Sequence, residues 1–554
     1  MNKNINIPDK LQKKILIIFY ILTTIIILLI YKDFGVHIEE KFHRLNGLYW
    51  LNYIANIFDL ESLHHATELK INEIKDLTLS PVSYYKRYGV ILDLPVALIE
   101  IAFDINKIKH VYEIKHLLSF LIFLTSSFFF FLILKKRFKD FFICLVGTIL
   151  FLTTPRIFGD SFLYKDILFL SFLNISLYFL LETTESINNK NLFLLSVFTA
   201  IAFSLKVFAL FIPFTFLFII IVKSFYEKNL KYYLKNFFKY FFFFIFFIYI
   251  FSPFLWADPF HNFLKIFFDL KKDLIGTNIK ILFDGNFVYN RYVPEDYLIT
   301  WILITTPIII LIFFSIGYLT YLFRFLKRFI SIKEKSIFND LWRGKKEQKD
   351  FVIFFLLNSI FLLLLIFNSP FYNGWRLVYF FNIFIIYIFI YQINNFLIIL
   401  RKKIFKKIVF LISVTSIVYN IVAIIAYHPF QSLYFNELII NEIDKKYEID
   451  YHGLSGKNFF QQIDKLDNSE VIKIGVASHT PLQRSLEGIE EEETKKKIYV
   501  VGQEFHNADY IYKNNISEVN PYLNNKYNIP KNFVKVYEFK VNKVLIYEIF
   551  KRQN

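Results

Sequence analysis

Long apolar segments constrain this chain more than any other feature of its sequence. A transmembrane helix needs about 20 mostly apolar residues to cross about 30 Å of hydrocarbon while satisfying its own backbone hydrogen bonds. The sequence predicts eleven such spans, near residues 15–31, 116–134, 140–154, 166–182, 192–205, 207–222, 240–255, 298–323, 351–367, 376–400 and 408–427. A water-soluble globule with a hydrophobic fraction of 55% would expose large apolar patches. We therefore predict an α-helical polytopic membrane protein.

The charges indicate how these spans are oriented. If the N-terminus is cytoplasmic, the inner segments carry 28 Lys or Arg against seven Asp or Glu, a net charge of +21. The remainder of the chain has 36 basic and 40 acidic residues, a net charge of −4. Cytoplasmic loops of membrane proteins hold such an excess of Lys and Arg. The overall charge of +17 therefore reflects membrane orientation, so we predict no nucleic-acid partner. An odd number of spans places the C-terminus outside.

Two outer segments between spans, 32–115 and 256–297, are too long to be simple connections. The first contains two amphipathic stretches, Lys41–Phe58 and Val90–Phe103, which we expect to form helices along the membrane surface. All eleven His residues also fall on the outer side or at the outer end of a span. Polar chemistry is therefore concentrated on the outer face.

The segment after the last span is more polar and predicts a small soluble domain. We expect a helix and several strands, at Lys457–Leu466, Val471–Val476, Ile498–Val501, Asp509–Tyr512 and, as a hairpin, Phe533–Phe550. The chain then divides into a transmembrane catalytic domain, residues 1–427, and an extracytoplasmic domain of the α/β or α+β class, residues 428–554.

Several functional classes are disfavoured by what the sequence lacks. It contains no phosphate-binding glycine loop, no dinucleotide fingerprint, no His-Glu-x-x-His and no Gly-x-Ser-x-Gly. The predicted spans have almost no ionisable residues in their interiors, whereas ion-coupled transporters place carboxylates or His near the midplane. Cys144 is the only cysteine, which excludes an intrachain disulfide and any multi-cysteine metal site. Pumping driven by ATP or by ions is therefore not expected of this chain alone.

Adjacent carboxylates follow the first span. Glu39 and Glu40 lie near the predicted membrane surface, where a reduced dielectric raises a carboxyl pKa and suits the group to act as a base. The plainer interpretation is a solvated acidic pair in a loop.

Two further polar groups lie on the same face. A short turn between the third and fourth spans contains Arg156, Lys165 and Asp166, where neutral residues would serve a mere connection. Arg376 begins the tenth span, and its planar guanidinium suits an anionic phosphate, although an Arg that only reaches the interface is the alternative. Carboxylates and basic residues beside lipid predict a site for a lipid-phosphate substrate.

An ordered set of short motifs resembles the GT-C superfamily of membrane glycosyltransferases, which includes the protein O-mannosyltransferase and aminoarabinose-transferase groups. The acidic motif of the first outer loop resembles Asp33-x-Gly35 with Glu39-Glu40 and Gly47, and the second-loop motif resembles Pro155-Arg156 through Lys165-Asp166. Later matches are Phe283-x-Gly285, Pro294-x-x-Tyr297, Thr306-Pro307, Tyr372-x-Gly374-x-Arg376 and Tyr427 through Asn436. Two positions depart from the family pattern, since Glu39 stands where Asp is usual and Leu377 where His often follows the Arg.

The resemblance implies an inverting transfer of a sugar from a polyprenyl-phosphate donor to a lipid, glycan or protein acceptor at the outer face of a bacterial inner membrane. Glu39 would be the base that deprotonates the acceptor, with Glu40 beside it and Asp166 as the second-loop carboxylate. The substrate-binding residues would be Arg156, Lys165, Arg376, Tyr372 and Tyr297. Some family members use a divalent metal, and this sequence establishes neither a metal nor another cofactor.

Two other functions remain open at this point. A lipid-linked-glycan ligase or polymerase would also use basic residues on the outer face, but would not need the carboxylates Glu39 and Glu40. A lipid or glycan transporter would retain its activity when Glu39 and Asp166 are neutralised.

Overall fold

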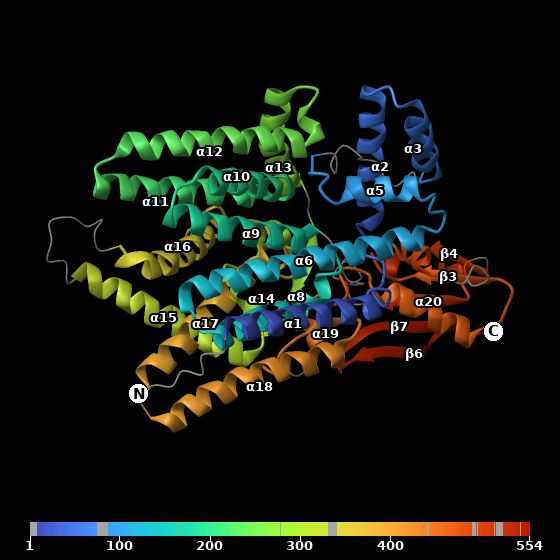
Figure 1. Cartoon of the computed structure of the whole chain (residues 1–554). Helices are drawn as coiled ribbons and strands as arrows, with labels where there is room; N and C mark the ends of the chain where they lie inside the picture. The colour runs from blue at the N-terminus through green and yellow to red at the C-terminus, as the bar shows by residue number, and fades with distance from the viewer. Residues whose placement is uncertain are drawn as a thin grey trace.

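All eleven apolar segments are helical in the structure, a computed structural model (Figure 1). It describes residues 8–553 apart from 75–86, 164, 277–278, 331–340, 401, 440–441, 490–494, 496, 515, 517–524 and 543. Within that part of the chain nine helices are long and apolar enough to cross a membrane. They are α1 (Asp9–Ile30), α6 (Ile108–Phe138), α9 (Lys165–Glu185), α11 (Phe211–Glu227, preceded by the 3₁₀ turn η1, Val207–Leu210), α12 (Leu230–Phe251), α15 (Ile308–Ile330), α16 (Gly344–Ile366), α17 (Phe381–Ile399) and α18 (Lys403–Tyr427).

The other two predicted spans are apolar but short. Helix α7 (Phe141–Thr153) has 13 residues and α10 (Asn189–Leu205) has 17. At 1.5 Å per residue, α7 covers only about 20 Å of the 30 Å hydrocarbon layer. Asp140 begins α7 by accepting the Ile143 N–H, and Asn188 begins α10 by accepting the Asn191 N–H. The predicted polytopic α-helical fold is confirmed, with nine helices of full length and two shorter ones among the described residues.

One predicted span, 298–323, is interrupted. It consists of α14 (Tyr297–Thr305) and α15, and the break falls at Thr306-Pro307. Pro307 has no N–H to donate, so the helical hydrogen-bond ladder cannot continue through it unchanged. Asn436 bridges the break, because its side-chain amide donates to the carbonyls of Leu303 and Thr306, both at 2.6 Å.

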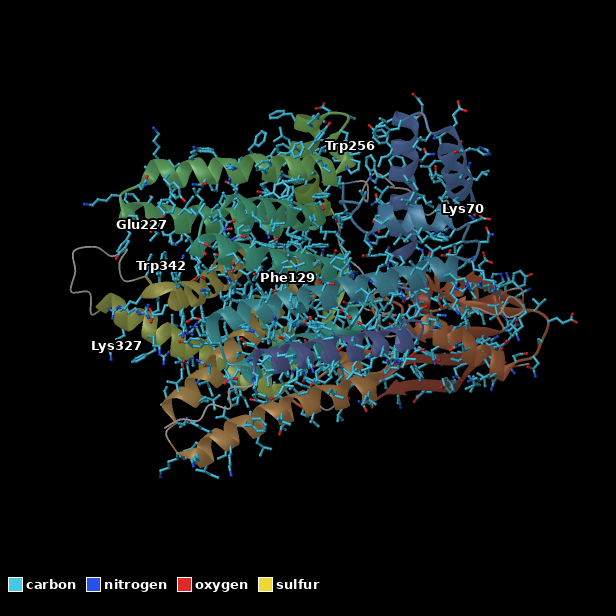
Figure 2. The ribbon with its side chains drawn as sticks, viewed as in Figure 1. Lys70, Phe129, Glu227, Trp256, Lys327 and Trp342 are labelled. Atoms are coloured by element: carbon cyan, nitrogen blue, oxygen red, sulfur yellow. The ribbon has the colours of Figure 1, made fainter. Side chains whose placement is uncertain are left out.

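The two ends of the bundle differ in what they carry. The end that we call the sheet end bears α2 (Glu40–Ile57), α3 (Glu61–Glu73), α5 (Asp93–Ala102) and the C-terminal sheet, whereas the α11–α12 and α17–α18 connections lie at the opposite end (Figure 1). Figure 2 places Phe129 midway along the bundle, Lys70 at the sheet end, and Glu227 and Lys327 at the opposite end. The described parts of the first outer segment and of the C-terminal region therefore lie at the same end.

Helices α2 and α5 confirm the two amphipathic stretches predicted in the first long segment. Helix α2 runs across the direction of the bundle helices, as does α3, which the sequence did not predict (Figure 1). Leu45, Leu48 and Leu51 of α2 form a small apolar cluster with Ala97 of α5. Burying this face against a neighbour is what stabilises such short helices.

A five-stranded mixed sheet forms the C-terminal region, in the order β4-β3-β5-β7-β6. Strands β3 (Ile472–Val476), β4 (Ile498–Gly502) and β5 (Tyr510–Asn514) are parallel, while β6 (Phe533–Val541) and β7 (Val544–Arg552) form the expected antiparallel hairpin. Helix α20 (Ser455–Leu466) packs on the sheet, with Phe459 against Tyr512 and Tyr547. The predicted strands and helix are confirmed within one or two residues.

The remaining elements connect these parts. They are α8 (Pro155–Asp160), α13 (Pro259–Gly276), α19 (Ile443–Lys446), α21 (Leu482–Ser485), the 3₁₀ turns η5 (Arg376–Val378) and η6 (Gln431–Leu433), and a hairpin of β1 (Lys280–Phe283) and β2 (Asn286–Tyr289). Asp284 and Gly285 join the two strands at φ values of 47° and 77°, the left-handed region that a two-residue hairpin turn requires.

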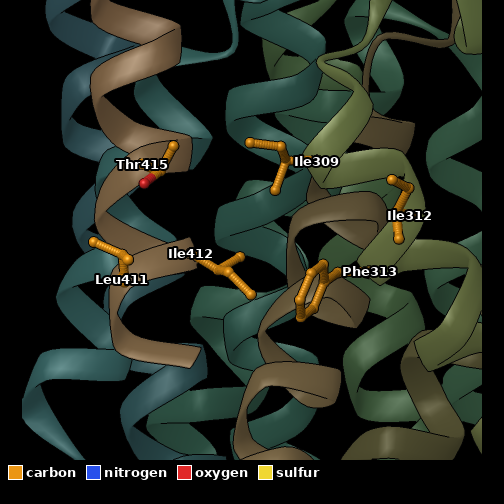
Figure 3. A pocket seen from close by; sticks show the side chains of 6 residues that line it. All are labelled: Ile309, Ile312, Phe313, Leu411, Ile412 and Thr415. Carbon is orange, nitrogen blue, oxygen red and sulfur yellow. The ribbon is translucent and has the colours of Figure 1, made fainter. Parts of the chain in front are cut away.

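An apolar cavity of about 260 Å³ lies between α15 and α18. Figure 3 shows its lining, with Ile309, Ile312 and Phe313 on one side and Leu411, Ile412 and Thr415 on the other. Because this lining offers almost no polar group, hydrocarbon is the occupant that it suits in a membrane.

Candidate active site

Arg376 connects the first long outer segment to the helix bundle. It lies in η5, and its Nη2 donates to Glu39 Oε1 at 2.9 Å. Its Nε lies 3.8 Å from Asp166 Oδ2, and the ring of Tyr372 is 5.3 Å from the guanidinium carbon. The structure therefore brings together Glu39, Asp166, Arg376 and Tyr372, which the sequence predicted separately.

Two lysines complete this group, which we call the Arg376 cluster. Lys206 forms an ion pair with Asp166 and donates to the Leu377 carbonyl at 3.0 Å. Lys165 interacts electrostatically with Glu39, Asp166 and Arg376, and its Nζ lies over the ring of Tyr88. Three basic side chains and two carboxylates thus meet at this place.

The Arg376 cluster is mostly buried, but its carboxylates are partly exposed to solvent. The side chain of Arg376 is 5% exposed, those of Asp166 and Glu39 17% and 27%. Among the described residues Arg376 Nε has no hydrogen-bond partner. A buried Arg whose Nε makes no hydrogen bond is suited to bind an anion that enters past Glu39.

Arg376 also sets the protonation state of Glu39. Burial alone would raise the pKa of the Glu39 carboxyl, but the positive charge of Arg376 holds it well below its ordinary value. Glu39 is therefore ionised, and it is a weak base for as long as Arg376 remains its partner.

Glu40 points away from Arg376. It is the first residue of α2, is 1% exposed, and its Oε1 lies 2.5 Å from His116 Nε2 of α6. Successive residues at the start of a helix diverge by about 100° around the axis, so adjacent carboxylates need not share a partner. Glu40 holds α2 against the bundle, while Glu39 faces the Arg376 cluster.

Arg156 and Tyr297 lie behind the turn that carries Arg376. Arg156 is 1% exposed, donates to the Tyr434 carbonyl at 3.2 Å, and is held between Trp301 and Phe435 at 5.3 and 5.0 Å from their ring centroids. Its Nη1 lies 3.4 Å from where a Cβ on Gly374 would stand, and Gly374 itself adopts a φ of +69°. The structure does not join Arg156 to the Arg376 cluster.

Tyr297 packs in the same aromatic region. It is 1% exposed, and its ring centroid lies 6.0 Å from that of Phe371 and 4.8 Å from that of Phe283. Of the predicted substrate-binding residues, Lys165, Arg376 and Tyr372 therefore meet at one place, whereas Arg156 and Tyr297 support the turn from behind.

Some residues of the site were not predicted. Lys206 is the clearest case, and its signal was a lone Lys between two apolar segments, a costly position unless the charge has a partner. His37 and His452 are the others. They are 415 residues apart in the chain, yet His37 Nε2 and His452 Nδ1 are 2.5 Å apart, and no local pattern indicates that pairing.

A divalent metal remains an expectation from the resemblance alone. Within the described ranges, no group of three or more His, Cys, Asp or Glu side chains is arranged to hold a metal ion. We therefore assign no role to a metal at the Arg376 cluster.

Comparison with known protein families identifies part of the chain. Residues 99–256 match the family model described as dolichyl-phosphate-mannose-protein mannosyltransferase, a family of the GT-C superfamily. The matched region runs from α5 to the end of α12 and includes Lys165, Asp166 and Lys206 of the Arg376 cluster. No curated protein matches the chain.

The fold and this match define the class of protein. The family match confirms the resemblance to GT-C enzymes for a region that covers less than a third of the chain. The structure adds multiple apolar helices of membrane-spanning length. The chain is thus an integral, multi-pass membrane protein with a glycosyltransferase region.

Proposed function

We propose that the protein transfers a sugar from a polyprenyl-phosphate donor to a hydroxyl group of a lipid, glycan or protein acceptor at the outer face of a bacterial inner membrane, with inversion at the anomeric carbon. The observation that carries the proposal is the shared position of Arg376 between Glu39 and Asp166, with Lys165 and Lys206 beside it. A carboxylate next to an anion-binding group of cations is what such a transfer requires.

These residues account for the proton and the charge that the reaction moves. The acceptor oxygen attacks the anomeric carbon and its proton passes to the Glu39 carboxylate, while the bond from the anomeric carbon to the phosphate oxygen breaks. The electron pair of that bond leaves with the polyprenyl phosphate, and Arg376, Lys165 and Lys206 neutralise the charge. Asp166 holds Lys206 and Arg376 in place.

Donor binding would itself activate the base. Because Arg376 keeps the pKa of Glu39 low, a donor phosphate that competes for the guanidinium returns that pKa toward its ordinary range. Glu39 then becomes a better proton acceptor only when the sugar donor is in place.

The other predicted residues take supporting roles. Tyr372 orients the guanidinium of Arg376 by its ring, Arg156 contributes positive charge from behind the turn, and Tyr297 packs that turn. Glu40 supports the acceptor side only through the position of α2. We also propose the division into a membrane domain, residues 1–427, and an extracytoplasmic domain, residues 428–554, since α18 ends at Tyr427.

The test is incubation of the purified protein with radiolabelled polyprenyl-phosphate sugars and a mixture of membrane acceptors. We expect sugar release with at least one donor, abolished by Glu39→Gln and retained by Glu61→Gln, which changes an exposed carboxylate in the same outer segment. Failure to release sugar from any donor contradicts the proposal.

The same assay separates the alternatives. A ligase or polymerase would transfer a preassembled glycan from a lipid-linked donor and would retain that activity in Glu39→Gln. A transporter would release no sugar, and its transport would survive both Glu39→Gln and Asp166→Asn.

A further inference from the structure

The segment that carries Glu39 is held by the C-terminal region, not only by the bundle. The Ile38 N–H donates to the His452 carbonyl at 3.1 Å, and Arg484 Nη1 donates to the Ile38 carbonyl at 2.8 Å. Lys457 Nζ donates to the Lys32 carbonyl at 2.6 Å. The backbone just before Glu39 is thus bonded on both sides by residues more than 400 positions later in the chain.

The contact is close enough to restrict the residue types that form it. A Cβ on Gly35 would stand 2.3 Å from the Leu454 carbonyl oxygen, far inside van der Waals distance. On the other side, the Asp450 carboxylate accepts the backbone N–H groups of Leu454 and Ser455 at 2.9 and 3.1 Å. These bonds shape the turn that presents His452.

A directed chain of hydrogen bonds runs from this turn to Glu39. The Glu39 N–H donates to His37 Nδ1 at 3.0 Å, so that nitrogen carries no proton. A neutral His37 then has its proton on Nε2, which donates to His452 Nδ1 at 2.5 Å. His452 Nε2 in turn lies 3.6 Å from Asp160 Oδ1, within ion-pair distance but without a hydrogen bond between them.

The surroundings keep His37 neutral, which the hydrogen bond from the Glu39 backbone to His37 Nδ1 requires. Burial, followed by the neighbouring His452, lowers the pKa of His37 well below its ordinary value. A proton added to His37 would occupy Nδ1 and break the bond from the Glu39 backbone.

We propose that His452 is a positioning residue that holds Glu39 toward Arg376 through His37, so that the C-terminal region completes the active site. This inference rests on the proposed function for its consequence in catalysis, but the positioning itself is independent of which sugar or acceptor is used. The C-terminal region, which lies outside the family match, thereby takes part in the active site.

Hydrogen–deuterium exchange on the purified full-length protein tests the positioning directly. In His452→Ala we expect the backbone amides of residues 36–44 to exchange about tenfold faster, because one buried hydrogen-bond chain is lost. His452→Asn should restore most of the protection, since its side-chain oxygen stands near the place of Nδ1 and accepts from His37. His506→Ala, at an exposed His of the same region, should leave exchange unchanged.

Kinetics provide the second measurement. For the donor that the wild type uses, His452→Ala should lower kcat at least about tenfold while KM for the donor changes little, because the cations that bind the phosphate remain. Unchanged exchange in folded His452→Ala, or an unchanged kcat, overturns the proposal. Should that variant fail to fold, His37→Leu cuts the same chain from the other side. If the wild type releases no sugar but exchange responds as expected, the proposed function fails and the positioning stands.

Discussion

Two Arg–carboxylate groups differ in how completely the Arg is paired: Arg137 with Asp350 at the end opposite the sheet, and the Arg376 cluster at the sheet end. A further pair, Arg44 with Glu100, joins α2 to α5. At the opposite end, Arg137 of α6 donates twice to Asp350 of α16, each bond 2.7 Å long, and Tyr387 of α17 adds a third bond to Asp350 at 2.8 Å. Arg137 meets Asp350 in a bidentate arrangement through its Nε and Nη2. Such a group binds three helices together.

The Arg376 cluster at the sheet end is built differently. Arg376 makes one 2.9 Å bond to Glu39 and lies 3.8 Å from Asp166, and among the described residues its Nε has no hydrogen-bond partner. We infer that an Arg bonded twice to one carboxylate stabilises the bundle, whereas an Arg with an N–H that makes no hydrogen bond is available to a ligand. Four predictions test that distinction.

The largest effect is expected at Arg376. Arg376→Gln should reduce kcat/KM for the sugar donor by about 10³-fold or more, because it removes the cation that meets the departing phosphate. Arg137→Gln is the matched variant at the other end, and the folded fraction should retain nearly full activity. Equal losses of kcat/KM in the two variants would show that the comparison between the ends is wrong.

The next effect is on stability. Asp350→Asn should lower the free energy of unfolding by about 3 kcal/mol, because it leaves the Arg137 guanidinium buried without a counter-ion. Asp166→Asn should lower it by less, since the Arg376 cluster retains Glu39. Unfolding in detergent, followed by helix signal for both variants under identical conditions, gives the comparison. A larger destabilisation from Asp166→Asn would reverse the assignment of structural and functional roles.

A smaller effect is expected from pH. The pKa of Glu39 is lowered in the folded protein, so the stability that its ion pair contributes is fully present above the ordinary carboxyl pKa and is lost only as pH falls through the lowered value. The difference in melting temperature between wild type and Glu39→Gln should therefore stay constant from about pH 7 to 5.5 and shrink only under more acidic conditions. A difference that already declines between these two values would contradict the assignment of Arg376 as the partner of Glu39.

The smallest effect is expected at Tyr372. Tyr372→Phe keeps the aromatic ring beside Arg376 and should change kcat/KM by less than about twofold, while Tyr372→Ala should cost about fivefold, as for a lost cation–π contact. Steady-state kinetics on the two variants are sufficient. If Phe and Ala behave alike, the ring has no orienting role and the hydroxyl must be considered.

Much of the fold follows from local rules. Each apolar segment is helical because a chain in hydrocarbon must satisfy its own backbone, and the C-terminal strands follow from alternation of apolar and polar residues. The break at Thr306-Pro307 shows the limit of hydropathy, because apolarity continues through the two residues while the hydrogen-bond ladder does not.

The candidate site was predictable only in part. Glu39, Lys165, Asp166 and Arg376 could be named because charges beside apolar spans need a reason to be there. Their pairing could not, since Glu39 and Glu40 are alike in sequence and only the direction of α2 sends one to Arg376 and the other to His116. Arg156 shows the converse, a residue of the expected type that the structure encloses between aromatic rings.

Hydropathy and charge along the chain are sufficient to predict a polytopic helical protein with its polar residues on one face. Those properties depend only on near neighbours in the sequence and on the membrane. Which carboxylate meets which cation, and the contact between His37 and His452, depend on contacts between residues hundreds of positions apart. Those contacts exist only after the bundle and the C-terminal region have packed together, so only the tertiary structure decides them.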